Sequence, residues 1–198
     1  MPIQKIYCVA WQRRHQDLTP AHSISYLPGF GRTLVCLILA SLTGVVGCGT
    51  NRFQQELNVE EAAIKLTNET IDGEYSLIAT AELKALLDGG ESILLVDTMP
   101  TASSYNEGHI PDAVNFEFPK EVIDEWNQTT MGKQTIAEFE SLLGDDKDRK
   151  IIFYCGYVKC PRSHNGAVFA RELGYTNVVR YPGGIDAWRG AGNKLTAN

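Results

Sequence analysis

Two cysteines lie five residues apart in the stretch "YCGYVKCPRSH", which runs from Tyr154 to His164. Cys155 directly follows the apolar, β-branched run 150–154, which predicts a buried strand, and residues 166–175 predict a helix. A cysteine is a nucleophile only as its thiolate, so its chemistry depends on what surrounds the sulfur. The stretch therefore predicts a reactive cysteine between a strand and a helix.

The residues after Cys155 are of types that favour an anion. Gly156 allows a tight turn in which backbone N–H groups point inward, and a helix N-terminus favours negative charge. Lys159 and Arg162 supply positive charge, and Ser163 can cap the helix or donate a hydrogen bond to a bound anion. We expect these features to hold Cys155 as a thiolate and to bind an anion, or an anionic adduct, at its sulfur.

Cys160 has several interpretations. It could resolve or protect an adduct on Cys155, form a disulfide with it, or pack as a bystander beneath the loop. A metal site made of Cys155, Cys160 and His164 is disfavoured, because no fourth ligand is evident and two cations lie beside the cysteines. We therefore predict neither a metal nor a cofactor.

Other polar residues suggest mainly structural roles. His109, in "GHIP", is expected to hydrogen-bond a turn, and His164 is expected to be a solvated helix residue. Asp97 ends an apolar run and is expected to hold the following loop through backbone hydrogen bonds.

The composition indicates a globular protein. The chain has 198 residues, of which 43% are hydrophobic and 21% charged, and its formal net charge is −6. This acidic balance argues against a nucleic-acid-binding protein, which would usually present a basic surface.

Strand and helix patterns alternate from about residue 76. This order predicts an α/β domain with a mostly parallel central sheet and helices on both faces. In such sheets ligands bind at the carboxyl ends of the strands, where Cys155 is placed. The predicted strands are 76–79, 92–97, 113–118, 150–154 and 177–180, and the predicted helices are 80–90, 120–126, 135–144 and 166–175.

The N-terminal quarter is expected to lie outside this domain. The apolar run that starts at Leu34 is too short to span a membrane comfortably and is typical of an export signal. It ends in "VVGC", which resembles the bacterial lipobox, so residues 1–47 are predicted to be a lipoprotein leader and Cys48 the lipidated residue. A leader of this length also suggests that translation starts further in, near Leu27.

Residues 48–75 are expected to be a weakly helical, polar tether, and 193–198 a tail. The protein would then face the periplasm on a lipid anchor. No aspartate follows Cys48, which favours the outer membrane.

Three separated segments resemble the rhodanese-like family, over residues 76–192. They are "LLVDTMPTASSYNEGHIPDAVNF", "IIFYCG…RSHNGAVFARELGY" and "NVVRYPGGIDAW". The resemblance implies a single rhodanese-like domain in which Cys155 carries sulfane sulfur as a persulfide. It also implies a donor such as thiosulfate, a thiol acceptor, and an anion-binding loop made of Gly156, Tyr157, Val158, Lys159, Cys160, Arg162 and Ser163.

The loop departs from the family pattern. Gly156 to Pro161 separate Cys155 from Arg162, two residues more than is usual in single-domain members, and the related phosphatases also have a shorter spacing. The first expectation is therefore a lipid-anchored sulfurtransferase. The alternatives are a thiol–disulfide or oxyanion-reducing module that uses both cysteines, and a non-catalytic domain that binds an anion or a partner.

Overall fold

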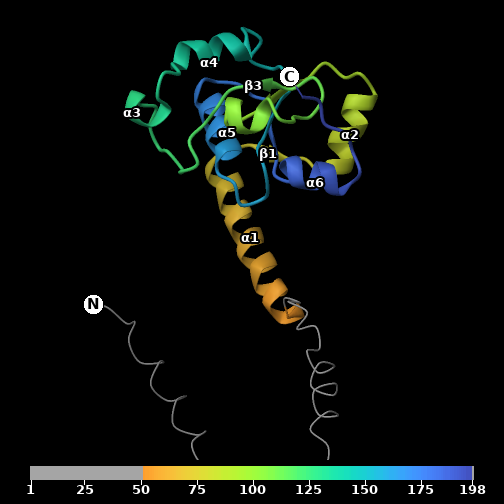
Figure 1. The fold of residues 1–198 in the computed structure, drawn as a ribbon. Helices are drawn as coiled ribbons and strands as arrows, with labels where there is room; N and C mark the ends of the chain where they lie inside the picture. The colour runs from red at the N-terminus through yellow and green to blue at the C-terminus, as the bar shows by residue number, and fades with distance from the viewer. Residues whose placement is uncertain (1–50, 198) are drawn as a thin grey trace, which may run out of the picture. The chain divides into compact units, whose positions relative to one another are not determined.

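The structure, a computed structural model, describes residues 51–197. Its centre is a five-stranded sheet with the order β1-β5-β4-β2-β3, in which every neighbouring pair is parallel (Figure 1). The predicted α/β class with a parallel central sheet is confirmed. The strands are β1 Ser76–Leu77, β2 Leu94–Asp97, β3 Val114–Asn115, β4 Ile151–Tyr154 and β5 Val178–Tyr181.

Helices cover both faces of the sheet. Along β4, Ile151 and Phe153 pack into one hydrophobic cluster, whereas Ile152 and Tyr154 pack into another, because successive side chains of a strand alternate between faces. Helices α4 and α5 contribute to the first cluster, and α2 and α6 contribute to the second. The helices are α1 Arg52–Asp72, α2 Thr80–Asp88, α3 Gln128–Met131, α4 Ile136–Leu143, α5 Arg162–Glu172 and α6 Gly184–Gly190, with a π-helical turn at Thr101–Tyr105.

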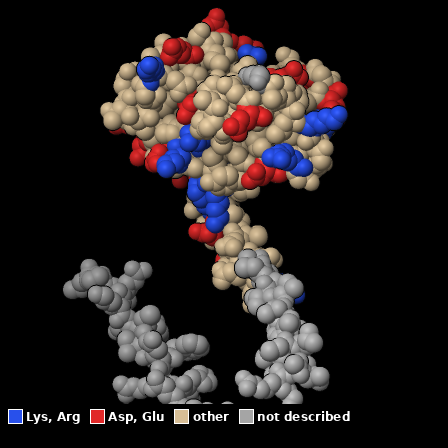
Figure 2. Space-filling view, viewed as in Figure 1, with Lys and Arg blue, Asp and Glu red and all other residues tan. Residues whose placement is uncertain are grey.

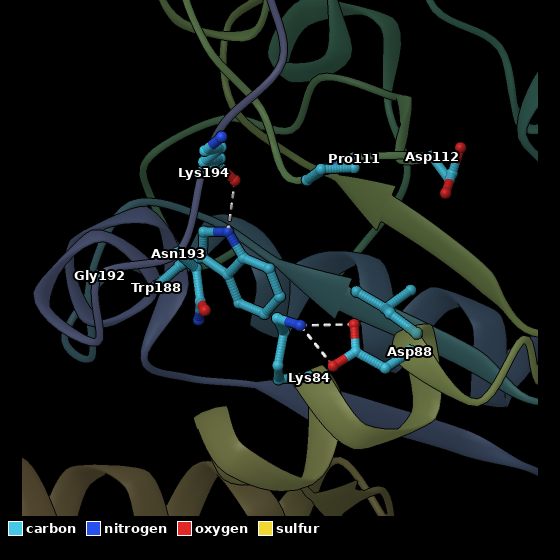
Figure 3. Close-up of a pocket in the computed structure, with 9 residues that line it drawn as sticks. Lys84, Asp88, Pro111, Asp112, Trp188, Gly192, Asn193 and Lys194 are labelled. Carbon is cyan, nitrogen blue, oxygen red and sulfur yellow. Dashed lines mark hydrogen bonds and ion pairs between the residues drawn. The ribbon is translucent and has the colours of Figure 1, made fainter.

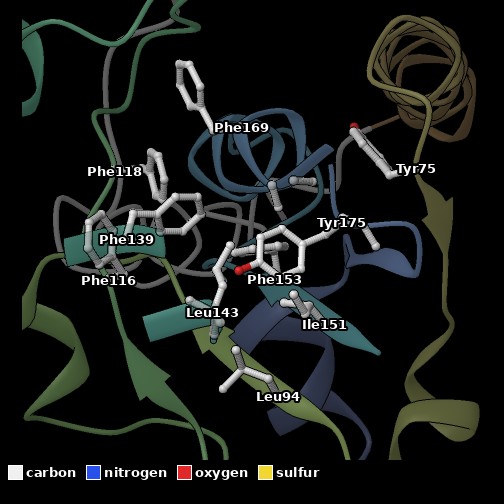
Figure 4. Packing of buried hydrophobic residues seen from close by; sticks show 14 of the residues in the cluster. Tyr75, Leu94, Phe116, Phe118, Phe139, Leu143, Ile151, Phe153, Phe169 and Tyr175 are labelled. Carbon is white, nitrogen blue, oxygen red and sulfur yellow. The ribbon is translucent and has the colours of Figure 1, made fainter. Parts of the chain in front are cut away.

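The larger cluster is rich in aromatic side chains (Figure 4). Phe118 packs edge-on against Phe139, with ring centroids 5.3 Å apart, and lies parallel to Phe169 at 6.3 Å. Each fully buried side chain of this size contributes roughly 1.5–3 kcal/mol to folding. This core fixes the position of α5, whose first turn forms part of the site.

The helix predicted at 120–126 is wrong. The side-chain amide of Asn165, on α5, donates to the carbonyls of Pro119 and Glu121 and accepts from the N–H of Ile123. These backbone groups are therefore hydrogen-bonded to α5 and do not form helical bonds with one another. Helix α5 itself begins at Arg162, earlier than the predicted 166.

The tether predicted at 48–75 is also corrected. It contains α1, a 21-residue helix whose Asn51 side chain caps the first turn by accepting from the N–H of Phe53, 3.1 Å away. This helix belongs to the same compact unit as the sheet. A buried ion pair between Glu69 on α1 and Arg180 on β5 joins the two.

The predicted leader, the lipidation site Cys48 and the proposed start near Leu27 lie outside the described residues. Within residues 51–197, no helix combines the length and the hydrophobicity that a membrane span requires. On the face seen in Figure 2, Lys and Arg side chains are interspersed with Asp and Glu side chains.

Candidate functional site

The sheet places Cys155 at its carboxyl edge, immediately after the central strand β4. The carbonyl of Cys155 accepts from the N–H of Ile185, and that of Gly156 accepts from Asp186, at 3.0 and 2.9 Å. Gly184 has a φ of +58°, and a Cβ at this position would lie 2.2 Å from the Cys155 oxygen. The first turn of α6 therefore lies directly against the cysteine loop, and only glycine fits at residue 184.

The longer loop forms a turn that returns Cys160 to the interior. The N–H of Cys160 donates to the carbonyl of Tyr157 at 3.0 Å, which closes a turn across residues 157–160. Tyr157 and Val158 are exposed at its tip, whereas Cys160 is only 4% exposed. Of the predicted loop residues, Tyr157 and Val158 thus face solvent, and Cys160 and Ser163 lie buried beside Cys155.

The sulfur of Cys155 is surrounded by protein. Its Sγ lies 3.2 Å from Ser163 Oγ, 3.4 Å from the carbonyl oxygen of Cys160 and 3.8 Å from that of Tyr157. A carbonyl oxygen favours the protonated thiol as a donor and disfavours the thiolate. Ser163 does not cap α5 with its side chain, as one prediction had it, but contacts the sulfur of Cys155 instead.

The expectation that the loop holds Cys155 as a thiolate is corrected. Burial raises the pKa of Cys155 well above its usual value, and the neighbouring Cys160 raises it further. The hydrogen bond from Cys155 lowers the pKa of Cys160 to about 6, and the backbone N–H groups of Arg162 and Gly156 also favour the Cys160 thiolate. The inward-pointing amides predicted for Cys155 thus act largely on Cys160.

Arg180 is the residue that sequence reasoning missed. It is fully buried on β5, and its Nε donates to Ser163 Oγ at 2.9 Å while its Nη2 donates to the carbonyl of Cys160 at 2.9 Å. Because Ser163 accepts from Arg180, its hydroxyl hydrogen is free to point at Cys155. A lone arginine within the apolar strand "NVVRY" was the available signal, since an arginine is almost never fully buried without a partner.

The two predicted loop cations differ in their surroundings. The ammonium of Lys159 forms an ion pair with Glu61 on α1 at 2.5 Å, so a carboxylate already neutralises it. Arg162 donates to the carbonyl of Phe118, and its charge favours the thiolate of Cys160. Positive charge reaches this loop from Arg162 and Arg180, not from Lys159.

His164 is buried, contrary to the prediction of a solvated residue. Its Nδ1 lies 2.9 Å from the hydroxyl of Tyr75, which in turn accepts from Arg180 at 3.1 Å. The hydroxyl of Tyr75 can therefore accept from Arg180 and still donate its own hydrogen to an unprotonated Nδ1 of His164. Burial and the Arg180 charge accordingly lower the pKa of His164 to about 4.

Two other predictions of structural roles are confirmed. His109 Nδ1 lies 2.9 Å from the carbonyl oxygen of Tyr105, and the two rings stack with centroids 4.0 Å apart. Asp97 accepts from the N–H of Met99 at 2.8 Å and thereby holds the loop after β2. Burial raises the pKa of Asp97.

Two surface hollows are candidate places for a ligand to enter. One of about 350 Å³ adjoins the cysteine loop and includes Asp97, Met99, Gly156 and Tyr157 in its lining. Another, of about 390 Å³, is lined by the exposed Lys84–Asp88 pair and by Trp188, whose indole N–H donates to the carbonyl of Lys194 at 2.9 Å (Figure 3). Neither Cys155 nor Cys160 lines either hollow, but the first is bounded by Gly156, the neighbour of Cys155. No group of three His, Cys, Asp or Glu side chains within residues 51–197 could hold a metal ion.

The solved structures that resemble this chain share its fold at low sequence identity. BH2092 from Bacillus halodurans is 24% identical over 68% of this chain and 86% of its own, with a TM-score of 0.45. Thiosulfate sulfurtransferase from Pseudomonas aeruginosa is 20% identical over 67% of this chain and 22% of its own, with a TM-score of 0.50. The polysulfide-sulfur transferase of Wolinella succinogenes is 14% identical over 75% of this chain and 95% of its own, with a TM-score of 0.48.

A comparison with curated proteins finds none that matches. The family model described as "Rhodanese-like domain" matches residues 79–191, more than half of the chain, and includes the cysteine loop, Arg180 and Gly184. The chain therefore belongs to the rhodanese-like domain family.

Proposed function

We propose that this protein is a sulfurtransferase that carries sulfane sulfur as a persulfide on Cys155. The sulfur would come from a small anionic donor such as thiosulfate and pass to a thiophilic acceptor such as a thiol. The observation that supports this most strongly is the set of groups around Cys155. Its sulfur lies at the carboxyl end of the central strand, 3.2 Å from a serine hydroxyl that buried Arg180 orients.

The charges around the loop suit an anionic donor. Arg162 lies at the loop and Arg180 beneath it, and the N–H of Ser163 points toward the Cys155 sulfur and favours its negative charge. The hollow beside Gly156 gives a small anion a route to this edge of the sheet. Attack by Cys155 on the outer sulfur of thiosulfate would release sulfite and leave the persulfide.

The test is the mass of residues 50–198 after anaerobic exposure to thiosulfate. We expect Cys160→Ser to gain one sulfur atom and Cys155→Ser to gain none, together with thiocyanate formation when cyanide is the acceptor. Failure of Cys155 to gain sulfur in both the parent protein and Cys160→Ser would rule out persulfide carriage. An inactive protein that still retains the anion would instead indicate a binding domain.

A second candidate, a module that reduces or exchanges disulfides, is favoured by one observation. Cys160 is buried within the same loop as Cys155, and both are free thiols. Loss of two hydrogens with no sulfur gained, on exposure to a disulfide, would support this reaction. Retention of that behaviour in Cys160→Ser would count against it.

We further propose that residues 1–47 are removed on export and that Cys48 is lipidated. The support is the sequence "LVCLILASLTGVVGC" alone, which combines an apolar segment with a lipobox-like end. The protein would face the periplasm from a lipid anchor, at the outer membrane. Membrane fractionation and the mass of the mature N-terminal peptide test this: Cys48→Ala should abolish both the lipid and the membrane attachment.

A further inference from the structure

We propose that Cys160 is the resolving thiol of this site. It attacks the persulfide of Cys155, forms a Cys155–Cys160 disulfide and releases the outer sulfur as hydrosulfide. The inference rests on the proposed function, because it starts from sulfur carried on Cys155. It assigns a chemical purpose to the two additional residues of the loop.

The loop geometry brings the two cysteines together. The turn at 157–160 reverses the chain, so that Cys160 returns to the interior while the tip of the turn stays exposed. As a result the Cys155 sulfur lies 3.4 Å from the carbonyl oxygen of Cys160, and each cysteine shifts the pKa of the other. Both cysteines are free thiols in this structure.

The surrounding groups favour Cys160 as a thiolate. The backbone N–H groups of Gly156 and Arg162 act on its sulfur, and the Arg162 charge adds to their effect. These groups lower the pKa of Cys160, while burial raises that of Cys155. The two neighbouring thiols titrate together, and Cys160 accepts the proton of Cys155 as that cysteine attacks the donor.

Both steps balance. In the first, Cys155–SH, Cys160–S⁻ and thiosulfate give Cys155–S–S⁻, Cys160–SH and sulfite; a bond forms from Cys155 to the outer sulfur of thiosulfate, and that sulfur's bond to sulfite breaks. In the second, the Cys160 sulfur attacks the Cys155 sulfur. The proton of Cys160 then leaves with the outer sulfur of the persulfide as HS⁻. The outer sulfur is reduced to hydrosulfide and the two cysteines are oxidised to a disulfide.

Burial favours this internal route over transfer to a bulky external thiol. Cys155 has no exposed surface, so a large acceptor would have to displace the loop, whereas Cys160 is buried in the same loop with its backbone carbonyl against the Cys155 sulfur. The disulfide would then need an external dithiol to restore the two thiols. Over a complete cycle the site would convert thiosulfate and a dithiol into sulfite, hydrosulfide and the oxidised dithiol.

Trypsin offers a direct test, because Lys159 lies between the two cysteines. Cleavage after Lys150, Lys159 and Arg162 places Cys155 in Ile151–Lys159 and Cys160 in Cys160–Arg162. The whole chain is reduced, freed of reductant, exposed to thiosulfate without oxygen, alkylated and digested. We expect these two peptides to be disulfide-linked and one hydrosulfide to be released per chain, with neither product formed in the absence of thiosulfate.

Variants separate this inference from the proposed function. In Cys160→Ser and Cys160→Ala the persulfide should accumulate on the Ile151–Lys159 peptide, with hydrosulfide at background. Persulfide that persists in the unsubstituted chain, with no linked peptides, would overturn the inference and leave the proposed function standing. Linked peptides that form equally without thiosulfate would show simple oxidation and also overturn it. Absence of sulfur on Cys155 in every variant would overturn the proposed function itself.

Discussion

At the scale of single residues, Ser163 is the group that couples Cys155 to the rest of the protein. Its hydroxyl contacts the sulfur at 3.2 Å and accepts from Arg180 at 2.9 Å. The hydroxyl lowers the pKa of Cys155 and thus opposes the larger effect of burial. The reactivity of this cysteine should depend on an oxygen that does not itself react.

Replacement of this oxygen should slow the reaction. In Ser163→Ala we expect the pH profile of Cys155 reaction with thiosulfate to move to higher pH and the rate at pH 7 to fall about fivefold, since one such hydrogen bond is worth about 1 kcal/mol. The rate of persulfide formation against pH is the measurement. Ser141→Ala, at an exposed serine on α4, is the matched control and should behave like the parent protein. An unshifted pH profile in Ser163→Ala would contradict the proposed coupling.

His164 should make the protein sensitive to acid. Its pKa is about 4 when folded, against 6.5 in a solvated chain, so between these values the unfolded state binds a proton that the folded state excludes. The stability that His164 contributes is therefore present above pH 6.5 and is lost as the pH falls toward 4. Urea unfolding at pH 7 and pH 5 measures this loss. The difference between the two pH values should be smaller in His164→Gln, and an equal difference would contradict the assignment.

At the scale of elements, α6 acts as a support for the cysteine loop. Two N–H groups in its first turn bind the carbonyls of Cys155 and Gly156, and the close approach depends on Gly184. The resemblance of "NVVRYPGGIDAW" to a family motif indicated that the glycines matter. The structure supplies the reason, which is contact between two backbones.

A methyl group at residue 184 should displace the loop. For Gly184→Ala we expect persulfide formation to fall by about 10²-fold, because a displacement of about 1 Å at a reacting group has an effect of that size. Gly190→Ala provides the control within the same helix, because nothing lies within 4 Å of its added Cβ. Comparable thiosulfate kinetics in the two variants would show that α6 does not position Cys155.

At the scale of the whole molecule, the domain includes a helix that precedes the family match. Glu69 on α1 forms an ion pair with fully buried Arg180, and the same arginine holds Ser163 and the carbonyl of Cys160. A second contact to α1 comes from Lys159 in the loop, which pairs with Glu61. Helix α1 is thus connected to the cysteine loop through two ion pairs.

Removal of the Glu69 charge should therefore affect both stability and the site. Glu69→Gln leaves Arg180 buried without its carboxylate, which typically costs roughly 3–5 kcal/mol. Asp88→Asn is the control, since it breaks the exposed i,i+4 pair with Lys84 and should cost less than about 1 kcal/mol. Urea unfolding of the two variants compares the costs. Equal, small losses would mean that α1 does not stabilise the domain.

The sequence by itself determined the features that depend on neighbouring residues. The apolar run before Cys155, the alternation of strands and helices, and the motifs around Gly108 and Gly184 were enough to predict a parallel α/β domain with Cys155 at a strand end. Such patterns are local, because a strand or a helix buries one face with a fixed period. The helix expected at 120–126 failed because Asn165 binds its backbone from another element.

Only the tertiary structure decided which groups surround the sulfur. Glu69 and Arg180 are 111 residues apart, and no local pattern joins them. The acidity of each cysteine likewise depends on burial and on the direction of individual N–H groups, which the residue types alone do not specify. That is why the sequence placed Cys155 at the end of a strand but did not predict that the groups around it raise the pKa of Cys155 and lower that of Cys160.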